Sequence, residues 1–263
     1  MNEPTVPYAP RPGVVHEQTW PAMRDGQWPV VLLPFGATEP HNTHLPYGTD
    51  TLLGAEVAAR VAAACIAKGT GVAALPAIPF GVNTTQLDLR FAINMMPSTQ
   101  LAVLRDVIRS LEPHGVKALV LLNAHGGNEL RALVRELQPS TPIVLAIVNW
   151  WQAGDHQAFE QAGDHAGELE TAAVMHVAPH LVVPDRAAWG DGYARPSVFG
   201  GVRAGWAWLP RRWTQVTDDT GVGDPRAASA EDGAVFVAQA VERIAGFCVQ
   251  LAAADADAMW QDG

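Results

Sequence analysis

Cysteine, long apolar runs and clustered positive charge are all scarce in this chain of 263 residues. Its two cysteines, Cys65 and Cys248, lie far apart in apolar stretches. Two such residues exclude a disulfide framework and are typical of buried thiols in a reducing compartment, so we expect a cytoplasmic protein. No apolar run approaches the length of a membrane span, and residues 1–13 lack the apolar core of a signal peptide. We therefore expect no membrane partner.

Basic residues are outnumbered by acidic ones. There are 17 Lys and Arg against 27 Asp and Glu, for a formal net charge of −10, and Arg211-Arg212 is the only basic doublet. This excludes a nucleic-acid surface, which needs clustered positive charge. With 48% hydrophobic and 17% charged residues, the composition is that of one globular domain over residues 1–263. We expect the proline-rich residues 1–27 to form an extended arm.

The most informative stretch is PFGATEPHNTHLPYGTD, residues 34–50, which follows a short apolar run typical of a buried strand. It holds Glu39, His41, His44 and Asp50 with no Lys or Arg. Carboxylates and neutral imidazoles suit zinc, manganese or iron, and a divalent ion relieves the repulsion between gathered carboxylates. Two simpler interpretations stay open: a polar turn with solvated histidines, and Asp50 as a cap of the helix predicted over residues 51–67.

A second histidine follows a second apolar strand. His125 comes directly after residues 117–122, beside Gly126 and Gly127, which let backbone approach a ligand closely. The intervening strand (72–79), loop (81–97) and helix (98–115, capped by Ser98) fit right-handed crossovers. The sequence therefore predicts an α/β three-layer sandwich with a mostly parallel central sheet flanked by helices, and both loops at one sheet edge.

Two later stretches add candidates for the same edge. A strand over residues 142–148 ends before Trp150 and Trp151, which either wall a pocket or cover the core or an oligomer interface. Residues 163–171 hold Asp164, His165, Glu168 and Glu170 before an apolar helix. The tryptophan-rich excursion over residues 184–218 is expected to cover the pocket or to pack on a neighbouring subunit.

Four motifs, taken in order, resemble the creatininase (creatinine amidohydrolase) family. They are GATEPHNTHLPYGTD, NAHGGNE, HAGELETA and TGVGDPRAASAEDG, spread over roughly residues 28–245. The resemblance implies an α/β sandwich with two divalent metal ions, often assembled as a hexamer. It also implies hydrolysis of non-peptide C–N bonds in small molecules such as cyclic amides and formamides, although one member acts on a peptide in mycofactocin maturation.

The resemblance also assigns roles by position. Glu39 and His125 should hold one metal, His41 the other, and Asp50 should bridge them. Creatininase has a carboxylate where this chain has Gly127, so a carboxylate of the third motif must replace it. His165 resembles the pocket histidine that donates a proton. The residues expected to contact substrate are Asn83, Gly126, Trp150, Trp151 and Asp164.

Helical periodicity favours Glu170 over Glu168 as the replacement ligand, with a part in catalysis. Residues two apart on a helix differ by about 200°, so both cannot face the metals. Ala173, Val174 and Val177 define a core side that runs back through Glu170, which places Glu168 near solvent. The expected activity is metal-assisted amide hydrolysis. The alternatives are a non-catalytic metal-binding member of the fold and the same site hydrolysing a lactone or other ester.

Overall fold

A single parallel sheet organises the protein. The computed structural model describes residues 9–161 and 163–260. Strands β1 (Val30–Phe35), β2 (Val72–Ala74), β3 (Ala118–Asn123) and β4 (Val144–Asn149) pair in the order β2-β1-β3-β4, and all of these pairings are parallel. Phe35, Asn123 and Asn149, the last residues of three strands, are aligned in the register. The segments that follow these strands therefore leave the sheet at the same edge.

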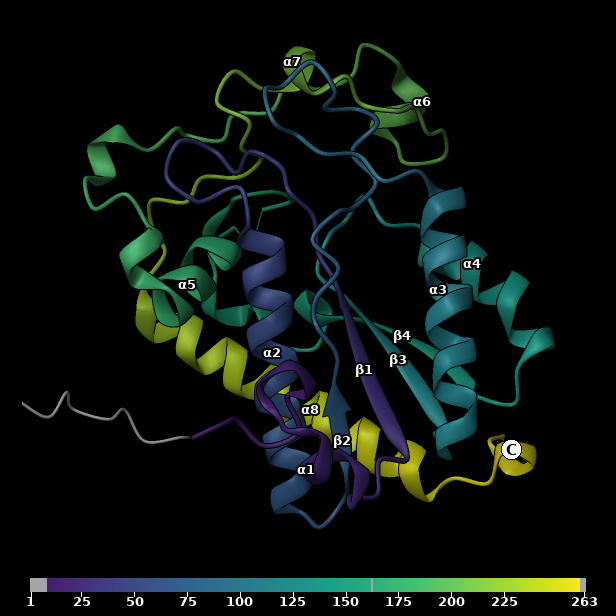
Figure 1. Ribbon diagram of the computed structural model, residues 1–263. Coiled ribbons are helices and arrows are strands. Elements are labelled where there is room, and N and C mark those ends of the chain that lie inside the picture. The colour runs from purple at the N-terminus through teal and green to yellow at the C-terminus, as the bar shows by residue number, and fades with distance from the viewer. Residues whose placement is uncertain (1–8, 162, 261–263) are drawn as a thin grey trace, which may run out of the picture.

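Helices cover both faces of the sheet (Figure 1). Val30 and Leu32 of β1 point into a core shared with α2 (Thr49–Ala67), α5 (Glu168–Val177) and α8 (Ala230–Ala253). Val31 and Leu33 alternate to the other face, against α3 (Pro97–Leu111) and α4 (Leu130–Leu137). Strands buried on both faces explain the apolar runs that the sequence showed, and the predicted three-layer α/β sandwich is confirmed.

Several element boundaries differ from the sequence prediction. Part of the expected N-terminal arm is helical, as η1 (Val15–Glu17) and α1 (Trp20–Arg24), and residues 1–8 of that arm lie outside the described part. Helix α3 begins at Pro97 with Met96 as its N-cap, because proline suits the first helical position, so Ser98 does not cap it. Helix α8 begins at Ala230, where the Ser229 hydroxyl accepts from the Asp232 amide.

Helix α8 is long and apolar enough to cross a membrane by length and composition alone, contrary to the expectation that no such run exists. One such helix is weak support for a span, since the core helix of a globular protein passes the same test. In this fold α8 packs on α2 and α5, with Phe236, Val237 and Ile244 buried. Both cysteines are free and buried in the same layer.

Long connections gather above the carboxyl edge of the sheet (Figure 1). Residues 81–97 form an irregular loop, as predicted, and residues 184–218 contain only short helices, η7 (Arg186–Ala188), α6 (Gly200–Arg203) and α7 (Trp213–Val216). The two segments are joined where the Trp213 amide donates to the Thr85 carbonyl, 3.1 Å away. The remaining short helices are η2 (Glu112–His114), η3 (Gln138–Ser140), η4 (Trp150–Gln152), η5 (His156–Ala158), η6 (Pro179–Leu181) and η8 (Ala256–Ala258).

Candidate metal centre

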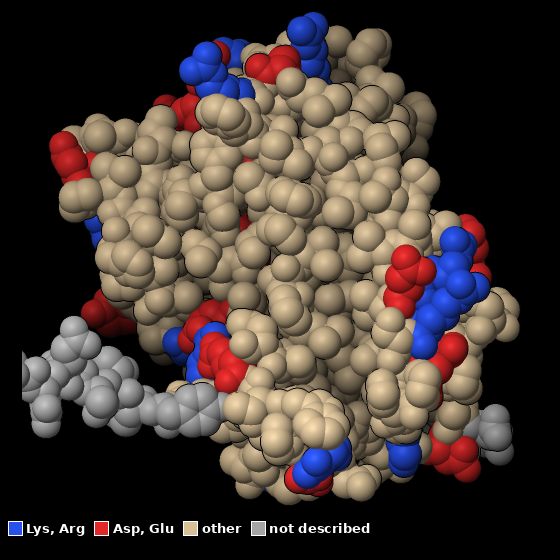
Figure 2. All heavy atoms as spheres, in the orientation of Figure 1, with Lys and Arg blue, Asp and Glu red and all other residues tan. Residues whose placement is uncertain are grey.

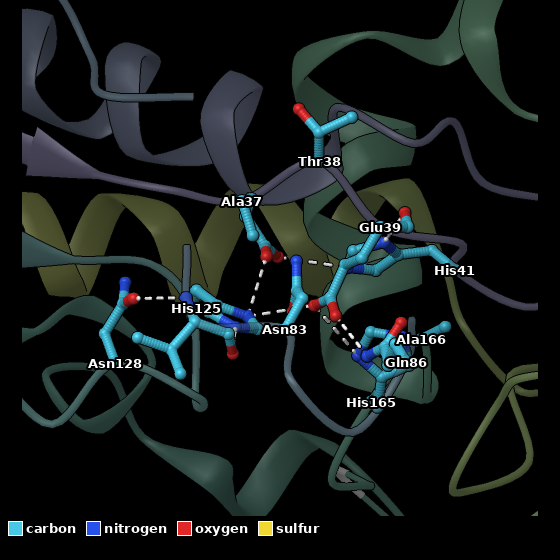
Figure 3. A network of polar contacts seen from close by, with 12 residues as sticks. Ala37, Thr38, Glu39, His41, Asn83, Gln86, His125, Asn128, His165 and Ala166 are labelled. Carbon is cyan, nitrogen blue, oxygen red and sulfur yellow. Dashed lines mark hydrogen bonds and ion pairs between the residues drawn. The ribbon is translucent and has the colours of Figure 1, made fainter. Parts of the chain in front are cut away.

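Carboxylates and imidazoles from four elements converge at the carboxyl edge of the sheet. Glu39 and His41 follow β1, His125 follows β3, Asp50 lies in the first turn of α2, and Glu170 lies in the first turn of α5. The amino-terminal ends of α2 and α5 favour the last two carboxylates, because helix dipoles present partial positive charge there. Figure 3 shows Glu39, His41, His125 and His165 pointing towards one another.

The ligand atoms fall into overlapping groups. His125 Nδ1 lies 2.9 Å from Glu39 Oε1 and 3.2 Å from Asp50 Oδ2, and these three residues form one group that could hold a metal. His41 Nε2 lies 3.0 Å from the other Asp50 oxygen, and His41, Asp50 and Glu170 form a second group. Asp50 belongs to both groups, with one oxygen towards each. A third group joins Glu39 and His41 with His165.

Backbone carbonyls fix the orientation of all three imidazole rings. His41 Nδ1 donates to the Glu39 carbonyl (3.0 Å), His125 Nε2 to the Val82 carbonyl (3.1 Å) and His165 Nε2 to the Pro40 carbonyl (2.8 Å). A carbonyl oxygen can only accept, so each of these nitrogens carries the proton. In a neutral ring the other nitrogen then turns its lone pair towards the side on which the carboxylates lie, where a cation would accept it, which is the arrangement that metal-ligating histidines show.

The carboxylates of the centre hold an excess of buried negative charge, which a bound cation would balance. Glu39, His41 and Asp50 are at most 2% exposed, and Glu39 Oε1 and Asp50 Oδ2 have no hydrogen bond of acceptable geometry. Burial acts to lower the pKa of His41, but Asp50 together with Glu170 and Glu39 outweighs it and raises the pKa to about 10. Burial acts to raise the pKa of Asp50, and the two neighbouring imidazoles lower it below its usual range. Divalent cations would take the place of these protons.

Glu170, and not Glu168, reaches the centre. Burial raises the pKa of Glu170, and its Oε2 accepts from the Ala166 amide at 2.6 Å. The argument that led to this choice was partly wrong, because Glu168 is only 3% exposed. Its Oε2 accepts from the Gln161 amide, 3.0 Å away. The first turn of α5 is thus enclosed on two sides, and Glu168 holds a loop there instead of facing solvent.

Unusual backbone conformations aim the histidines. Asn42 and Ala166, directly after His41 and His165, have φ values of 54° and 49°. A left-handed conformation costs a non-glycine residue on the order of 1 kcal/mol and marks functional sites more often than ordinary loops.

At Gly127 a Cβ atom would lie 2.4 Å from both His125 Nε2 and the Val82 carbonyl. Glycine at this position is therefore a condition for the hydrogen bond that orients His125.

His165 lies between the ligands and solvent. Its Nδ1 is 3.7 Å from Glu39 Oε1, and its ring meets the Trp213 ring edge to face at 5.2 Å. His44, which the sequence placed among the candidates, is buried but lies in none of the groups that could hold a metal. Burial lowers the pKa of His44 to about 4, and its Nε2 pairs with the Thr171 hydroxyl at 2.8 Å. It is a neutral structural residue.

A cavity of about 280 Å³ opens beside the centre. Its wall includes Glu39, His125 and His165 together with the predicted contact residues Asn83, Gly126 and Asp164. Trp208, Leu209 and Trp213 of the excursion line its outer part, as expected of a covering segment. Arg211, from the same segment, forms an ion pair with Asp164.

The two adjacent tryptophans divide between core and cavity. Trp151 lines a smaller adjoining cavity with His165 and Glu170. Trp150 is 1% exposed and packs edge to face on Phe236 at 5.7 Å. The prediction that Trp150 contacts substrate is wrong, because its ring fills the core under α8.

Two features of the centre were missed from the sequence. Gln86, 3% exposed, donates through Nε2 to Glu39 Oε2 (Figure 3). Asn128, just before α4, accepts from the Val82 amide (3.2 Å) and donates to Asn123 (3.1 Å) behind His125, while Glu129 is the residue that directly precedes the helix. A run of polar residues in a loop carries no periodic signal, so only the fold shows which of its members are buried.

Comparisons with known proteins agree with this geometry. The sequence profile of the family described as Creatininase: Creatinine amidohydrolase matches residues 16–248. A mycofactocin precursor peptide peptidase of Mycobacterium tuberculosis (strain CDC 1551 / Oshkosh) is 30% identical over 233 residues, or 84% of this chain and 87% of that one. A Bacteroides fragilis NCTC 9343 structure, provisionally named a creatinine amidohydrolase, is 35% identical, with a TM-score of 0.88 over 95% and 99% of the chains. A manganese form of creatininase is 24% identical, with a TM-score of 0.72 over 90% and 97%.

Asp50→Asn should abolish binding of both divalent ions, whereas His41→Ala should abolish mainly one. Asp50 offers one oxygen to each group of ligands, and an amide bridges two cations poorly, while His41 belongs to the group of Asp50 and Glu170. The measurement is elemental analysis of the purified variants together with metal titration of the apo proteins. Asp88→Asn, which removes a carboxylate on the 81–97 loop, is the matched control and should keep parental metal content. Equal losses in Asp50→Asn and His41→Ala would contradict the bridge.

Glu170→Gln should lose the ion that His41 helps to hold, and Glu168→Gln should keep both ions. Glu170 shares a group of ligands with His41 and Asp50, while Glu168 accepts a backbone amide outside that group. Both carboxylates lie in the first turn of α5, so the two variants are matched in position and in chemistry. Metal content and apo-protein titration measure the difference. Loss of the ion in Glu168→Gln, with retention in Glu170→Gln, would reverse the assignment.

Proposed function

The chain belongs to the creatininase family of amidohydrolases, and from this membership we propose that it hydrolyses an amide C–N bond at a dinuclear divalent-metal site. The observation that carries the proposal is the position of Asp50, whose two oxygens face two different sets of ligands. A shared carboxylate of this kind is what a pair of cations requires. Zinc, manganese and iron all suit carboxylate and imidazole ligands, and a related creatininase structure carries manganese.

When bound, two such cations lower the pKa of a water molecule and polarise a carbonyl oxygen. The rest of the reaction falls to residues of this chain. The substrate carbonyl would enter through the cavity whose wall holds Glu39, His125 and His165. Trp208 and Leu209 of the excursion line the same cavity. Asn83 Oδ1, buried in the same wall without a partner, is an acceptor for a substrate N–H.

His165 is the group placed to move a proton. Its Nε2 proton is held by the Pro40 carbonyl, so Nδ1 is the atom that gains and gives a proton on the ligand side. That atom lies 3.7 Å from Glu39 Oε1, within reach of a group bound between the carboxylates and the cavity. We assign His165 as the proton donor to the leaving nitrogen, with Glu170 acting in the reaction as a ligand of the second ion.

The substrate is proposed to be a small molecule containing a cyclic amide or a formamide. A cavity of about 280 Å³ is at the small end of the range for ligand pockets, and it suits a compact substrate. A peptide bond is the second candidate, because a relative 30% identical to this chain is named a peptidase. The cavity mouth, with Trp208 80% exposed, leaves room for a chain that extends outwards.

The metal-reconstituted protein should hydrolyse at least one compound in a panel of cyclic amides, formamides and short peptides. His165→Asn should lower kcat for that compound by about 100-fold or more with little change in metal content, because a positioned proton donor contributes 10²–10⁴-fold. Product formation by mass spectrometry, with the apo protein as control, measures this. Matching lactones in the panel test the ester alternative. Full metal occupancy without turnover of any member would support a non-catalytic metal-binding protein.

The protein is further proposed to be a homo-oligomer, for which the family resemblance suggests a hexamer. Large apolar side chains stand exposed around the excursion and the 81–97 loop, including Trp206 (80%), Val198 (84%) and Phe91 (73%). Figure 2 shows a broad uncharged area on one face of the molecule, with most charged side chains at its margins. Exposed apolar surface of this kind usually meets a partner.

Light scattering at micromolar concentration should give a mass several times that of the 28.0 kDa chain. Trp206→Glu, which places a charge in the exposed apolar area, should lower that mass because a buried unpaired charge destabilises an interface. Trp260→Glu is the matched control, at a tryptophan near the C-terminus that is 92% exposed, and it should keep the parental mass. A monomeric parent protein would refute the proposal.

A further inference from the structure

We propose that Gln86 is a positioning residue that holds Glu39 as a one-oxygen metal ligand. The proposal rests on the function proposed above, since it concerns how this chain prepares a ligand for a divalent ion. Gln86 Nε2 donates to Glu39 Oε2, while Glu39 Oε1 faces His125 Nδ1 at 2.9 Å. The two oxygens of one carboxylate are thereby given different partners, and only Oε1 is left for a cation.

The orientation of the Gln86 amide is fixed by its partner. A carboxylate oxygen can only accept, so the amide nitrogen must face Glu39 and the amide oxygen must point elsewhere. That oxygen, Oε1, is buried and has no hydrogen-bond partner in the described structure. Burying an unpaired amide oxygen is unfavourable, and an apolar side chain would avoid it. Gln86 thus gives the chain a hydrogen bond to Glu39 at the expense of a buried, unpaired amide oxygen.

The loop does not need the Gln86 side chain to keep its shape. Around it, Thr84, Leu87 and Asp88 are exposed, and Gln86 is the one buried residue among residues 84–90. Backbone bonds already anchor the segment, from the Gln86 amide to the Asn83 carbonyl and from the Trp213 amide to the Thr85 carbonyl. Asp88 adds a hydrogen bond from the Thr214 hydroxyl, 2.6 Å away. The side-chain amide of Gln86 therefore bonds Glu39 and has no part in anchoring the loop.

The hydrogen bond from Gln86 to Glu39 Oε2 limits how Glu39 can bind a metal ion. A carboxylate that binds through both oxygens fills two coordination positions of a metal, and one that binds through a single oxygen fills one. Catalytic sites keep a position open for water or substrate. Gln86 lines the same cavity as Glu39 and His125, so the position kept free would face the space through which substrate enters. Gln86 would thus preserve both the angle of Glu39 and the open position.

The test compares Gln86→Met with Gln138→Met by cobalt titration of the apo proteins, followed by visible spectroscopy. Methionine keeps the length of the side chain and removes the donor. Gln138 is the matched control because it is also a glutamine with a hydrogen-bonded side chain, which donates to the Ile143 carbonyl (2.9 Å) and accepts from the Leu145 amide (2.8 Å) far from the centre. Thermal unfolding of both variants measures any general loss of stability.

Gln86→Met should lower the affinity for one of the two ions by about 10- to 100-fold, the usual effect of removing a hydrogen-bonding partner of a metal ligand. Without the donor on Oε2, Glu39 could bind the ion through both oxygens and raise its coordination number. The visible absorption of bound cobalt should therefore weaken, because six-coordinate Co²⁺ absorbs less than four- or five-coordinate Co²⁺. Gln138→Met should keep parental affinities and spectrum. Parental behaviour of Gln86→Met, or equal weakening of both ions with a loss of thermal stability, would refute the role of Gln86. A parent protein that takes up no cobalt would refute the metal centre itself, a separate result that requires no variant.

Discussion

The structure depends on one electrostatic constraint, the gathering of three carboxylates around Asp50: Glu39 and Asp50 are buried, and the partly buried Glu170 lies on the other side of Asp50. Carboxylates brought together away from water repel, and burial alone raises their pKa values. His41 and His125 offset this only if they carry protons, and the carboxylates around His41 raise its pKa to about 10. The pair of divalent cations proposed above would balance the same negative charges while leaving both imidazoles neutral.

The parallel sheet brings these groups together with few residues. Because β1 and β3 are adjacent and parallel, the loops after Phe35 and Asn123 begin side by side at one edge. The helices that follow contribute through their first turns, so Asp50 and Glu170 enter with the favourable end of a helix dipole. Backbone carbonyls of the loop after β1 orient His41 and His165, whereas His125 is oriented by the Val82 carbonyl of the 81–97 loop. The loop after β1 therefore supplies ligands and also orients two of the imidazoles.

This explains which parts of the centre could be predicted from the sequence. Glu39, His41 and His125 follow strands, so strand periodicity and crossover handedness predict that they lie at one edge of the sheet. Asp50 could equally have been a helix cap, and its role as a bridge was implied only by the family resemblance. Trp150 and Trp151 carry no such signal, because either of two adjacent rings at a strand end can face the core. Glu168 was misplaced because periodicity assumes one buried side, whereas the first turn of α5 is enclosed on two. Gln86 was missed because an irregular loop has no period from which to predict burial.

Gly127 links the local geometry of the centre to the distant core. A Cβ atom there would lie 2.4 Å from both His125 Nε2 and its carbonyl partner, so a carboxylate at that position and this orientation of His125 exclude each other. A ligand for the second proposed ion must then come from another element, and Glu170 of α5 is the carboxylate that lies in a group with His41 and Asp50. Helix α5 packs closely on α8, where a Cβ atom at Gly233 would lie 2.0 Å from the Ala172 carbonyl. The position of Glu170, and with it the second proposed metal site, therefore depends on the close approach of two helices on the far side of the sheet from α3 and α4.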